Sequence, residues 1–276
     1  MSALPAGAAE PADAVTDDAD LERRFGGLRR LYGDVAYRRI RAAHVAVVGL
    51  GGVGSWTAEA LARSGVAALT LVDLDHVAES NVNRQVQALG STLGMAKVEA
   101  LRMRIADIHP GCAVVGIEEF VDETNWPALL ARRPDVVVDA CDDVRAKAAL
   151  AAWALGTESP LVCVGAAGGK RAAERVEAGD LAAVTHDPML AALRQRLRKV
   201  HGASRGGPLG IGCVFSREPV VAPDAADAAC DVDGSLNCHG YGSSVAVTAT
   251  FGMVAAARAL ELVANPAVRP VVRATI

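Results

Sequence analysis

The stretch HVAVVGLGGVGS, residues 44–55, decides the fold class of this chain. The apolar run at 44–48 predicts a buried β-strand, and it breaks at a glycine-rich turn that leads into a helical pattern. Glycines let the backbone approach a phosphate group closely, and the N-terminus of the following helix offers free N–H groups and a partial positive charge. The turn therefore predicts a phosphate-binding site, built on Gly49, Gly51, Gly52 and Gly54.

Further along the chain, strand-like and helix-like segments alternate. Short β-branched runs at 69–73, 114–117, 136–139 and 161–164 predict strands, and helical patterns lie at 55–64, 94–109 and 144–155. Alternation at these lengths is typical of βαβ units. We therefore expect an α/β fold, a Rossmann-like and mainly parallel sheet with helices on both faces. The nucleotide-binding core spans 44–165, and the looser pattern after it predicts a loop-rich C-terminal elaboration at 166–276.

Composition agrees with this fold and separates a tail from the domain. The 276 residues are 51% hydrophobic with 27 glycines and only 4% aromatics, which suits a parallel sheet with tight turns. Residues 1–22 carry six acids and no Lys or Arg, so the net charge of −4 becomes +2 for the remainder. We interpret 1–22 as a disordered acidic tail and 23–276 as the folded domain.

Cysteine spacing and the last apolar run bear on metal, compartment and membrane. None of the six cysteines (Cys112, Cys141, Cys163, Cys213, Cys230 and Cys238) forms a C-x-x-C pair, so we expect no structural zinc. Buried thiols are typical of a reducing, cytoplasmic location. The uncharged run at 241–257 is at the short limit for a bilayer span. We expect a buried helix there and no stable membrane span, with peripheral membrane contact left open.

Charged residues after the glycine turn favour ATP over NAD. Asp73 ends the second expected strand, where a carboxylate can bind ribose hydroxyls. Arg84 and Lys97 follow, and such cations can stabilise the charge that builds on a departing pyrophosphate. Asp142 is expected at the end of the strand at 136–139, where it can hold Mg²⁺ beside the phosphates. A pyrophosphate-bridged dinucleotide needs no such additional cations.

Together these motifs resemble the ubiquitin-activating-enzyme-like ThiF/MoeB family, whose members adenylate a carboxylate. The resemblance rests on residues 49–55, Asp73-x-Asp75, the run at 80–85, Lys97 and 141–143. It implies ATP contacts at Gly52, Asp73, Asp75, Ser80, Asn81, Asn83, Arg84, Lys97 and Asp142. It further implies a homodimer in which Arg24 reaches the ATP bound to the partner.

A narrower resemblance extends to nearly the whole chain beyond the tail. The motifs RFGG at 24–27, GCVFS at 212–216 and TATFG at 248–252 are similar to the tRNA threonylcarbamoyladenosine dehydratase branch of the family. Members of this branch close the threonylcarbamoyl side chain of a tRNA nucleoside into a ring. Adenylation suits that chemistry, because AMP is a good leaving group and a nucleophile in the same substrate can close the ring at high effective molarity. The sequence leaves open whether Cys213 or Cys238 forms a thioester. It also leaves open whether a sulfur-relay protein is a partner.

A tRNA substrate requires contacts to phosphates. Residues 165–205 hold eight basic and four acidic side chains, and their leucines give one apolar helical face. A solvated basic helix face explains this pattern equally well from the sequence alone, and the resemblance favours tRNA. The candidate contacts are Lys170, Arg171, Arg194, Arg196, Arg198 and Lys199.

Three other functions compete with the dehydratase. An adenylyltransferase for a ubiquitin-like sulfur carrier predicts a zinc site, which the cysteine spacing disfavours. An NAD-linked dehydrogenase is disfavoured by the combination of Arg84, Lys97 and Asp142. The sequence does not distinguish the dehydratase from a dimer that binds ATP as a sensor without turning it over.

Overall fold

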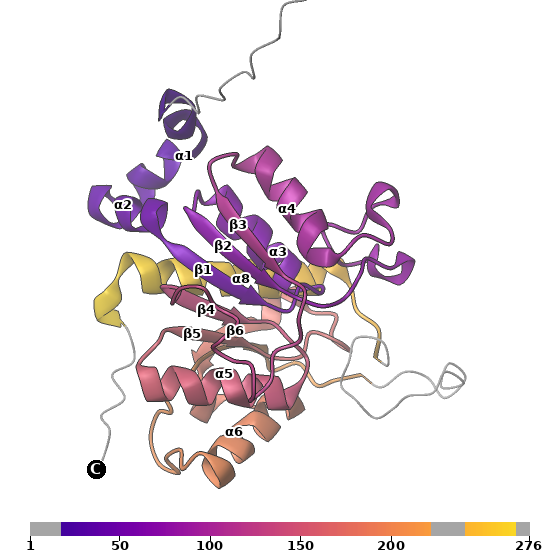
Figure 1. Cartoon of the computed structure of the whole chain (residues 1–276). Coiled ribbons are helices and arrows are strands. Elements are labelled where there is room, and N and C mark those ends of the chain that lie inside the picture. The colour runs from indigo at the N-terminus through magenta and orange to yellow at the C-terminus, as the bar shows by residue number, and fades with distance from the viewer. Residues whose placement is uncertain (1–17, 222–240, 269–276) are drawn as a thin grey trace, which may run out of the picture.

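One seven-stranded sheet organises the molecule, as the computed structural model shows for residues 18–221 and 241–268 (Figure 1). The strand order is β3-β2-β1-β4-β5-β7-β6, with six parallel strands and β6 antiparallel to β7 at one edge. The strands are β1 (His44–Val48), β2 (Ala68–Val72), β3 (Ala113–Ile117), β4 (Val136–Asp139), β5 (Leu161–Val164), β6 (Val176–Asp180) and β7 (Gly212–Ser216). The prediction of a Rossmann-like, mainly parallel sheet is confirmed.

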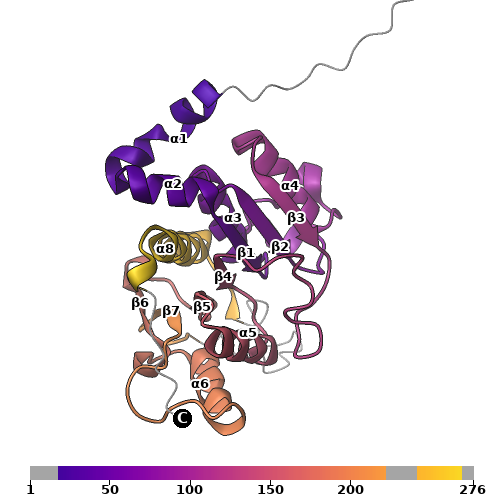
Figure 2. The ribbon, with the colours of Figure 1, turned by 60° about the vertical axis from the view of Figure 1, so that its left-hand side comes forward.

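Helices cover both faces of the sheet, as expected (Figure 2). One core cluster joins alternate strand residues such as Val45 and Leu69 to α2, α3, α4 and α8. The other joins the intervening residues, such as Ala46 and Val137, to α5 and α6. The helices are α1 (Asp18–Tyr32), α2 (Asp34–Ala42), α3 (Gly54–Arg63), α4 (Lys97–Ile108), α5 (Val144–Thr157), α6 (Pro188–Val200) and α8 (Val245–Ala264).

Side-chain caps begin three of these helices. The carboxylate of Asp143 accepts hydrogen bonds from two N–H groups at the start of α5, and Asp187 caps α6 just before its first residue, Pro188. Ser244 caps α8. Such caps satisfy backbone donors that have no partner inside the helix. These three helix starts are therefore encoded locally in the sequence.

Helix α8, although last in the described chain, packs behind the first βα unit. Phe251 and Val247 are buried in the same cluster as Leu61 of α3. The Thr57 hydroxyl of α3 donates to the carbonyl of Gly252 at 3.2 Å, and a Cβ on Gly252 would lie 2.6 Å from the carbonyl oxygen of Val53. By length and composition α8 is the one helix of the described residues that could cross a membrane. Half of its most apolar 18-residue stretch is buried within the protein.

Three expectations about the chain's organisation need correction. Helix α1 starts at Asp18, so residues 18–22 of the predicted tail are helical. The segment from 166 to 221 is less loop-rich than expected, because β7 pairs with β5 and β6 pairs with β7, which extends the sheet. The fourth strand ends at Asp139, and Asp142 lies three residues later in the loop before α5.

Candidate active site

A cavity of about 530 Å³ lies at the carboxyl ends of the parallel strands. In doubly wound sheets ligands bind at this edge, where the strand order reverses, and here the reversal lies between β1 and β4. The loops after β1, β2, β3, β4 and β5 all contribute walls. Of the nucleotide residues predicted from the sequence, the following line it: Gly49, Gly51, Gly52, Asp73, Asp75, Arg84, Lys97 and Asp142.

The glycine turn forms the centre of the cavity wall. Gly49 has a φ of 84°, and a Cβ there would lie 2.7 Å from the backbone nitrogen of Cys141. A Cβ on Gly54 would collide with the carbonyl oxygen of Gly49, so the turn closes only with glycine at both positions. No side chain caps the start of α3, and the space beside Gly51 is open. The backbone is therefore shaped to receive a phosphate at this helix N-terminus.

Arg84 lines the cavity and has one unsatisfied donor. The side chain is 7% exposed, and its terminal nitrogen donates to the Ser80 carbonyl at 2.7 Å and to the Asn83 side chain at 2.9 Å. Its Nε is buried and has no hydrogen-bond partner. Buried donors are rarely left unpaired in native proteins. Arg84 therefore keeps hydrogen-bonding capacity that its protein partners do not use.

Lys97 and two aspartates form the next part of the wall. The Lys97 ammonium lies 2.7 Å from Asp75 and 3.8 Å from Asp73, and it is 5% exposed. The two carboxylate oxygens of Asp73 accept hydrogen bonds from Leu50 N at 2.5 Å and Asp75 N at 2.9 Å. Burial raises the pKa of Asp73, and Lys97 opposes that shift. Each Asp73 oxygen keeps a lone pair for a ribose hydroxyl.

Asp142 is free to bind a cation. Its exposed carboxylate lines the cavity and has no hydrogen-bond or ion-pair partner among the described residues. Across residues 18–221 and 241–268 no group of three or more His, Cys, Asp or Glu side chains could hold a metal. A single carboxylate together with substrate phosphates is a usual Mg²⁺ environment. The site thus fits a magnesium ion that arrives with a nucleotide.

A buried ion pair fixes the loop that carries Asp142. Lys147 is 0% exposed and its ammonium lies 3.1 Å from the Asp139 carboxylate. That carboxylate accepts hydrogen bonds from the backbone nitrogen and the thiol of Cys141 and from the Cys163 thiol. Burial, and then Asp139, raise the pKa values of both thiols well above their usual range. These cysteines are therefore structural and not nucleophilic.

The other residues predicted to bind the nucleotide do not line the cavity but stabilise the segments that do. Gly54 closes the glycine turn, as described above. The Asn81 side chain accepts from Ala78 N at 3.1 Å and so shapes the segment at 78–81. Ser80 and Asn83 provide the oxygens that hold Arg84.

Arg24 does not line the cavity of its own chain. Its guanidinium donates to the carbonyl of Ile108 at 2.8 Å, at the end of α4.

The candidate tRNA contacts lie apart from the cavity, and four of the six have partners within the protein, among them Arg198, which donates to the Ser204 carbonyl at 3.2 Å. Lys170 is 2% exposed and its ammonium donates to the carbonyls of Ser216 and Glu218, so it does not present a surface charge. Arg194 donates to two backbone carbonyls, those of Leu181 and Val184. The structure thus corrects the expectation that Lys170 presents its charge to tRNA, and it shows that the Arg194 guanidinium is held by the protein backbone.

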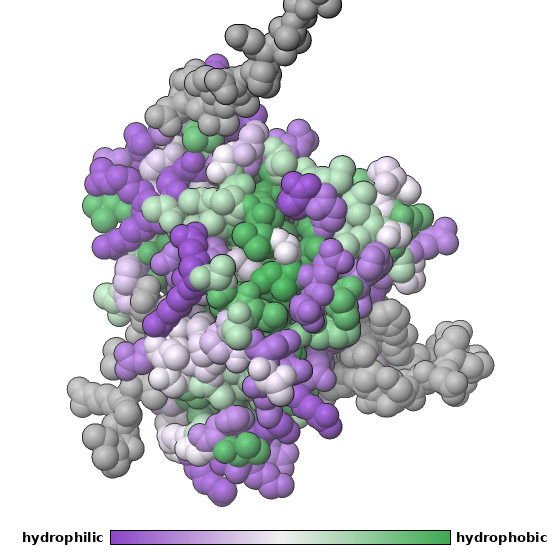
Figure 3. Space-filling model, viewed as in Figure 1, coloured by the Kyte–Doolittle hydropathy of each residue, from purple (hydrophilic) through white to green (hydrophobic). Residues whose placement is uncertain are grey.

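The remaining basic residues are distributed over α6 and its surroundings. Arg196 pairs with Glu123 at 2.6 Å. A hollow of about 420 Å³ is lined by Arg194, Arg198, Lys199 and Arg205. The side chains over α6 in Figure 3 are mostly hydrophilic. Arg171 is exposed at another position, before β6.

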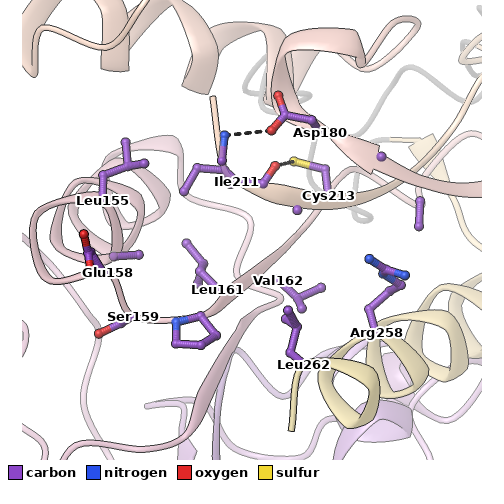
Figure 4. A pocket seen from close by; sticks show the side chains of 16 residues that line it. Leu155, Glu158, Ser159, Leu161, Val162, Asp180, Ile211, Cys213, Arg258 and Leu262 are labelled. Carbon is purple, nitrogen blue, oxygen red and sulfur yellow. Dashed lines mark hydrogen bonds between the residues drawn. The ribbon is translucent and has the colours of Figure 1, made fainter. Parts of the chain in front are cut away.

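A second cavity, of about 280 Å³, lies at the opposite edge of the sheet (Figure 4). It is lined by the end of α5, the starts of β5 and β7, and Arg258 of α8. Cys213 lies there, 1% exposed, with its thiol directed at the Ile211 carbonyl. Burial raises the pKa of Cys213 strongly, which makes it a poor candidate for a thioester. Cys238 lies outside the described residues.

Several cavity residues were not predicted from the sequence as site residues. Thr248 of α8 touches the site, since its Cβ lies 3.2 Å from the position of a Cβ on Gly52. The wall that follows β4 and β5 includes Arg145, the segment 165–168 and Met189. The rule that ligands bind beyond the strand ends indicates the segment after β5, but only the fold brings α6 and α8 to the same cavity.

The fold and this cavity define a nucleotide-binding α/β protein with a cationic phosphate site. The ThiF family model matches residues 25–272, so the chain belongs to the ThiF family.

Two relatives show how the similarity is distributed. A tRNA threonylcarbamoyladenosine dehydratase of Escherichia coli K12 is 42% identical over 256 residues, which cover 90% of this chain and 96% of the relative. A molybdopterin-synthase adenylyltransferase of the same organism is 37% identical over 123 residues, 45% of this chain and 49% of the relative.

A solved structure is similar throughout. The crystal structure of Escherichia coli tRNA N6-threonylcarbamoyladenosine dehydratase in complex with ATP has a TM-score of 0.82 and 41% identity. The match covers 93% of this chain and 99% of that chain.

Proposed function

We propose that this chain is an ATP-dependent tRNA threonylcarbamoyladenosine dehydratase. The observation that carries the proposal is the similarity to the Escherichia coli dehydratase, which extends over 90% of this chain and includes the residues after β5. The molybdopterin-synthase adenylyltransferase matches only 45% of the chain. Activation of a sulfur carrier is therefore the weaker candidate.

The reaction has two steps. An oxygen of the substrate carboxylate attacks the α-phosphorus of ATP, the bond to the bridging oxygen breaks, and pyrophosphate leaves with the electron pair. A nucleophile of the same side chain then attacks the acyl carbon and loses its proton, and AMP leaves with the former carboxylate oxygen. The water formally removed is thus accounted for in AMP and pyrophosphate.

The cavity residues fit the first step. Arg84 and Lys97 lie where they would stabilise negative charge on the departing pyrophosphate. Asp73 would hold the ribose. Asp142 would hold Mg²⁺, which neutralises phosphate charge when bound. The ring closure needs no protein nucleophile, which agrees with the burial of the thiols at Cys163 and Cys213.

We also propose a homodimer, in line with the expected role of Arg24. Two observations support it. Arg24 is held at the end of α4 and does not line its own cavity, so a role at a nucleotide requires the other copy. Apolar side chains also gather on the face over β3, where Val115 and Phe120 are 53% and 62% exposed (Figure 3). We propose a cytoplasmic location because the proposed substrate is tRNA. A sulfur-relay protein as partner stays a prediction.

The proposal is tested with tRNA that carries threonylcarbamoyladenosine. Incubation with the protein, ATP and Mg²⁺ should release pyrophosphate and convert the nucleoside to a product lighter by one water, as mass spectrometry of the digested tRNA would show. Arg84→Ala or Lys97→Ala should lower turnover roughly 10²- to 10³-fold. Pyrophosphate release with a sulfur-carrier protein but not with tRNA would overturn the proposal.

A further inference from the structure

Three cationic side chains line the large cavity, and one of them has no partner. Lys97 is paired with Asp75, and Arg84 holds two oxygens through its terminal nitrogen. The guanidinium of Arg145 is exposed and forms no hydrogen bond or ion pair with the described residues. Its charge is therefore available to a bound anion.

The position of Arg145 separates it from the phosphate cations. β1 lies between β2 and β4 in the sheet. Arg84 and Lys97 follow β2, whereas Arg145 follows β4, so they flank the glycine turn on opposite sides. Because the Asp143 carboxylate accepts hydrogen bonds from Arg145 N at 2.6 Å and Ala146 N at 2.8 Å, these backbone donors of α5 are already used. The Arg145 side chain is thus the cation that this side of the cavity offers to an anion.

The part of the wall formed by residues 165–168 and Met189 carries no charge, whereas Asp142 and Asp143, just before Arg145, bring carboxylates to the same cavity. The loop is held in place by Asp187, whose carboxylate accepts from Ala166 N at 2.8 Å and from Leu190 N at 2.9 Å. This part of the cavity suits a short aliphatic group with one carboxylate better than a further phosphate, which needs several donors.

We propose that Arg145 binds the carboxylate of the threonine-derived side chain of the tRNA substrate. This inference rests on the proposed function. The arginine fork matches a carboxylate with two parallel hydrogen bonds, which fixes the direction of the attacking oxygen. With the triphosphate at Arg84 and Lys97, the α-phosphorus would lie near the glycine turn, between these two cations and Arg145. Arg145 then contributes by orientation, because pairing with a cation does not itself make a carboxylate more reactive.

The experiment compares Arg145→Ala, Arg145→Lys and a matched control. Arg258→Ala is the control, because Arg258 is also exposed and without a partner among the described residues but lies at the opposite edge of the sheet (Figure 4). Steady-state kinetics are measured with modified tRNA, and binding of a non-hydrolysable ATP analogue is measured by calorimetry. Thermal unfolding checks that each variant is folded.

Arg145→Ala should lower kcat/KM for the modified tRNA roughly 10- to 100-fold, the factor expected for a lost charge-assisted hydrogen-bond pair, and part of the loss should appear in kcat because the carboxylate is no longer oriented. Affinity for the ATP analogue should stay within about twofold of the wild type, as for Arg258→Ala, and Arg145→Lys should recover part of the loss. An equal loss of ATP-analogue affinity would place Arg145 in the nucleotide site, and unchanged kinetics would leave it without a role. Either result overturns the inference alone, whereas a wild-type protein that fails to convert tRNA overturns the proposed function with it.

Discussion

The buried pair of Lys147 and Asp139 allows a prediction with a definite size. Replacing Lys147 by Met keeps the length of the side chain but removes its charge. Asp139 is then left as an unpaired carboxylate with 0% exposure, and the hydrogen bond to the Val164 carbonyl at 2.7 Å is lost. Burial alone lowers the pKa of a lysine, but Asp139 raises the pKa of Lys147 above its ordinary value, so the pair is ionised.

Breaking one partner of such a pair costs about 3–5 kcal/mol. A protein of this size loses roughly 2–4 °C in Tm for each kcal/mol, so Lys147→Met should unfold roughly 6–20 °C below the wild type. The double variant Lys147→Met with Asp139→Asn should recover most of the loss, because no charge then remains buried without a partner. Scanning calorimetry of the two single variants and the double variant measures this directly. If Lys147→Met unfolds within about 2 °C of the wild type, or if the double variant is no more stable than the singles, the pair does not hold the loop as described.

Three further predictions test other parts of the structure. Burial, and then a neighbouring arginine, lower the pKa of His109 from 6.5 to about 4, so the unfolded chain binds the extra proton and stability falls as pH drops from about 6.5 to about 4. At about 1.4 kcal/mol per pKa unit this loss reaches at most about 3.5 kcal/mol. Denaturant melts of His109→Gln should show a flatter dependence of stability on pH, and a profile that overlays the wild type would contradict the assignment. Replacing Lys199 and Arg205 together by Glu should weaken tRNA binding and make the dependence of tRNA affinity on salt shallower, with ATP binding unchanged. If wild type and variant show the same salt dependence, this basic surface does not contact tRNA phosphates. Mixing inactive Arg24→Ala and Lys97→Ala subunits should restore part of the activity, because each mixed dimer has one complete site, and no recovery despite subunit exchange would argue against a shared site.

Much of the core could be predicted from local sequence. The strands at 136–139 and 161–164 coincide with β4 and β5, and the predicted cations after β2 meet at one cavity. These elements are short apolar runs bounded by glycine or aspartate, so periodicity and turn chemistry suffice.

The rest depends on tertiary context. β6 has the sequence VEAGD, which lacks a regular apolar alternation and forms a strand only because β7 offers it an edge. Lysine is usually a surface residue, but Lys170 is buried and its ammonium donates to the carbonyls of Ser216 and Glu218. Arg145 and Thr248 are separated by about a hundred residues and line the same cavity only once α5 and α8 have packed on the two faces of the sheet. No local pattern carries that information.

The close contact between α8 and the glycine turn has a consequence for biosynthesis. Gly252 touches the backbone at Val53, and Phe251 fills the core behind the first βα unit. A nascent chain that has emerged only as far as β7 already contains Arg84 and Lys97, but the apolar side of α3 is still uncovered. During synthesis the first βα unit therefore completes its core only after the residues of α8, at 245–264, have left the ribosome. A chain truncated before α8 would leave the apolar side of α3 exposed to solvent.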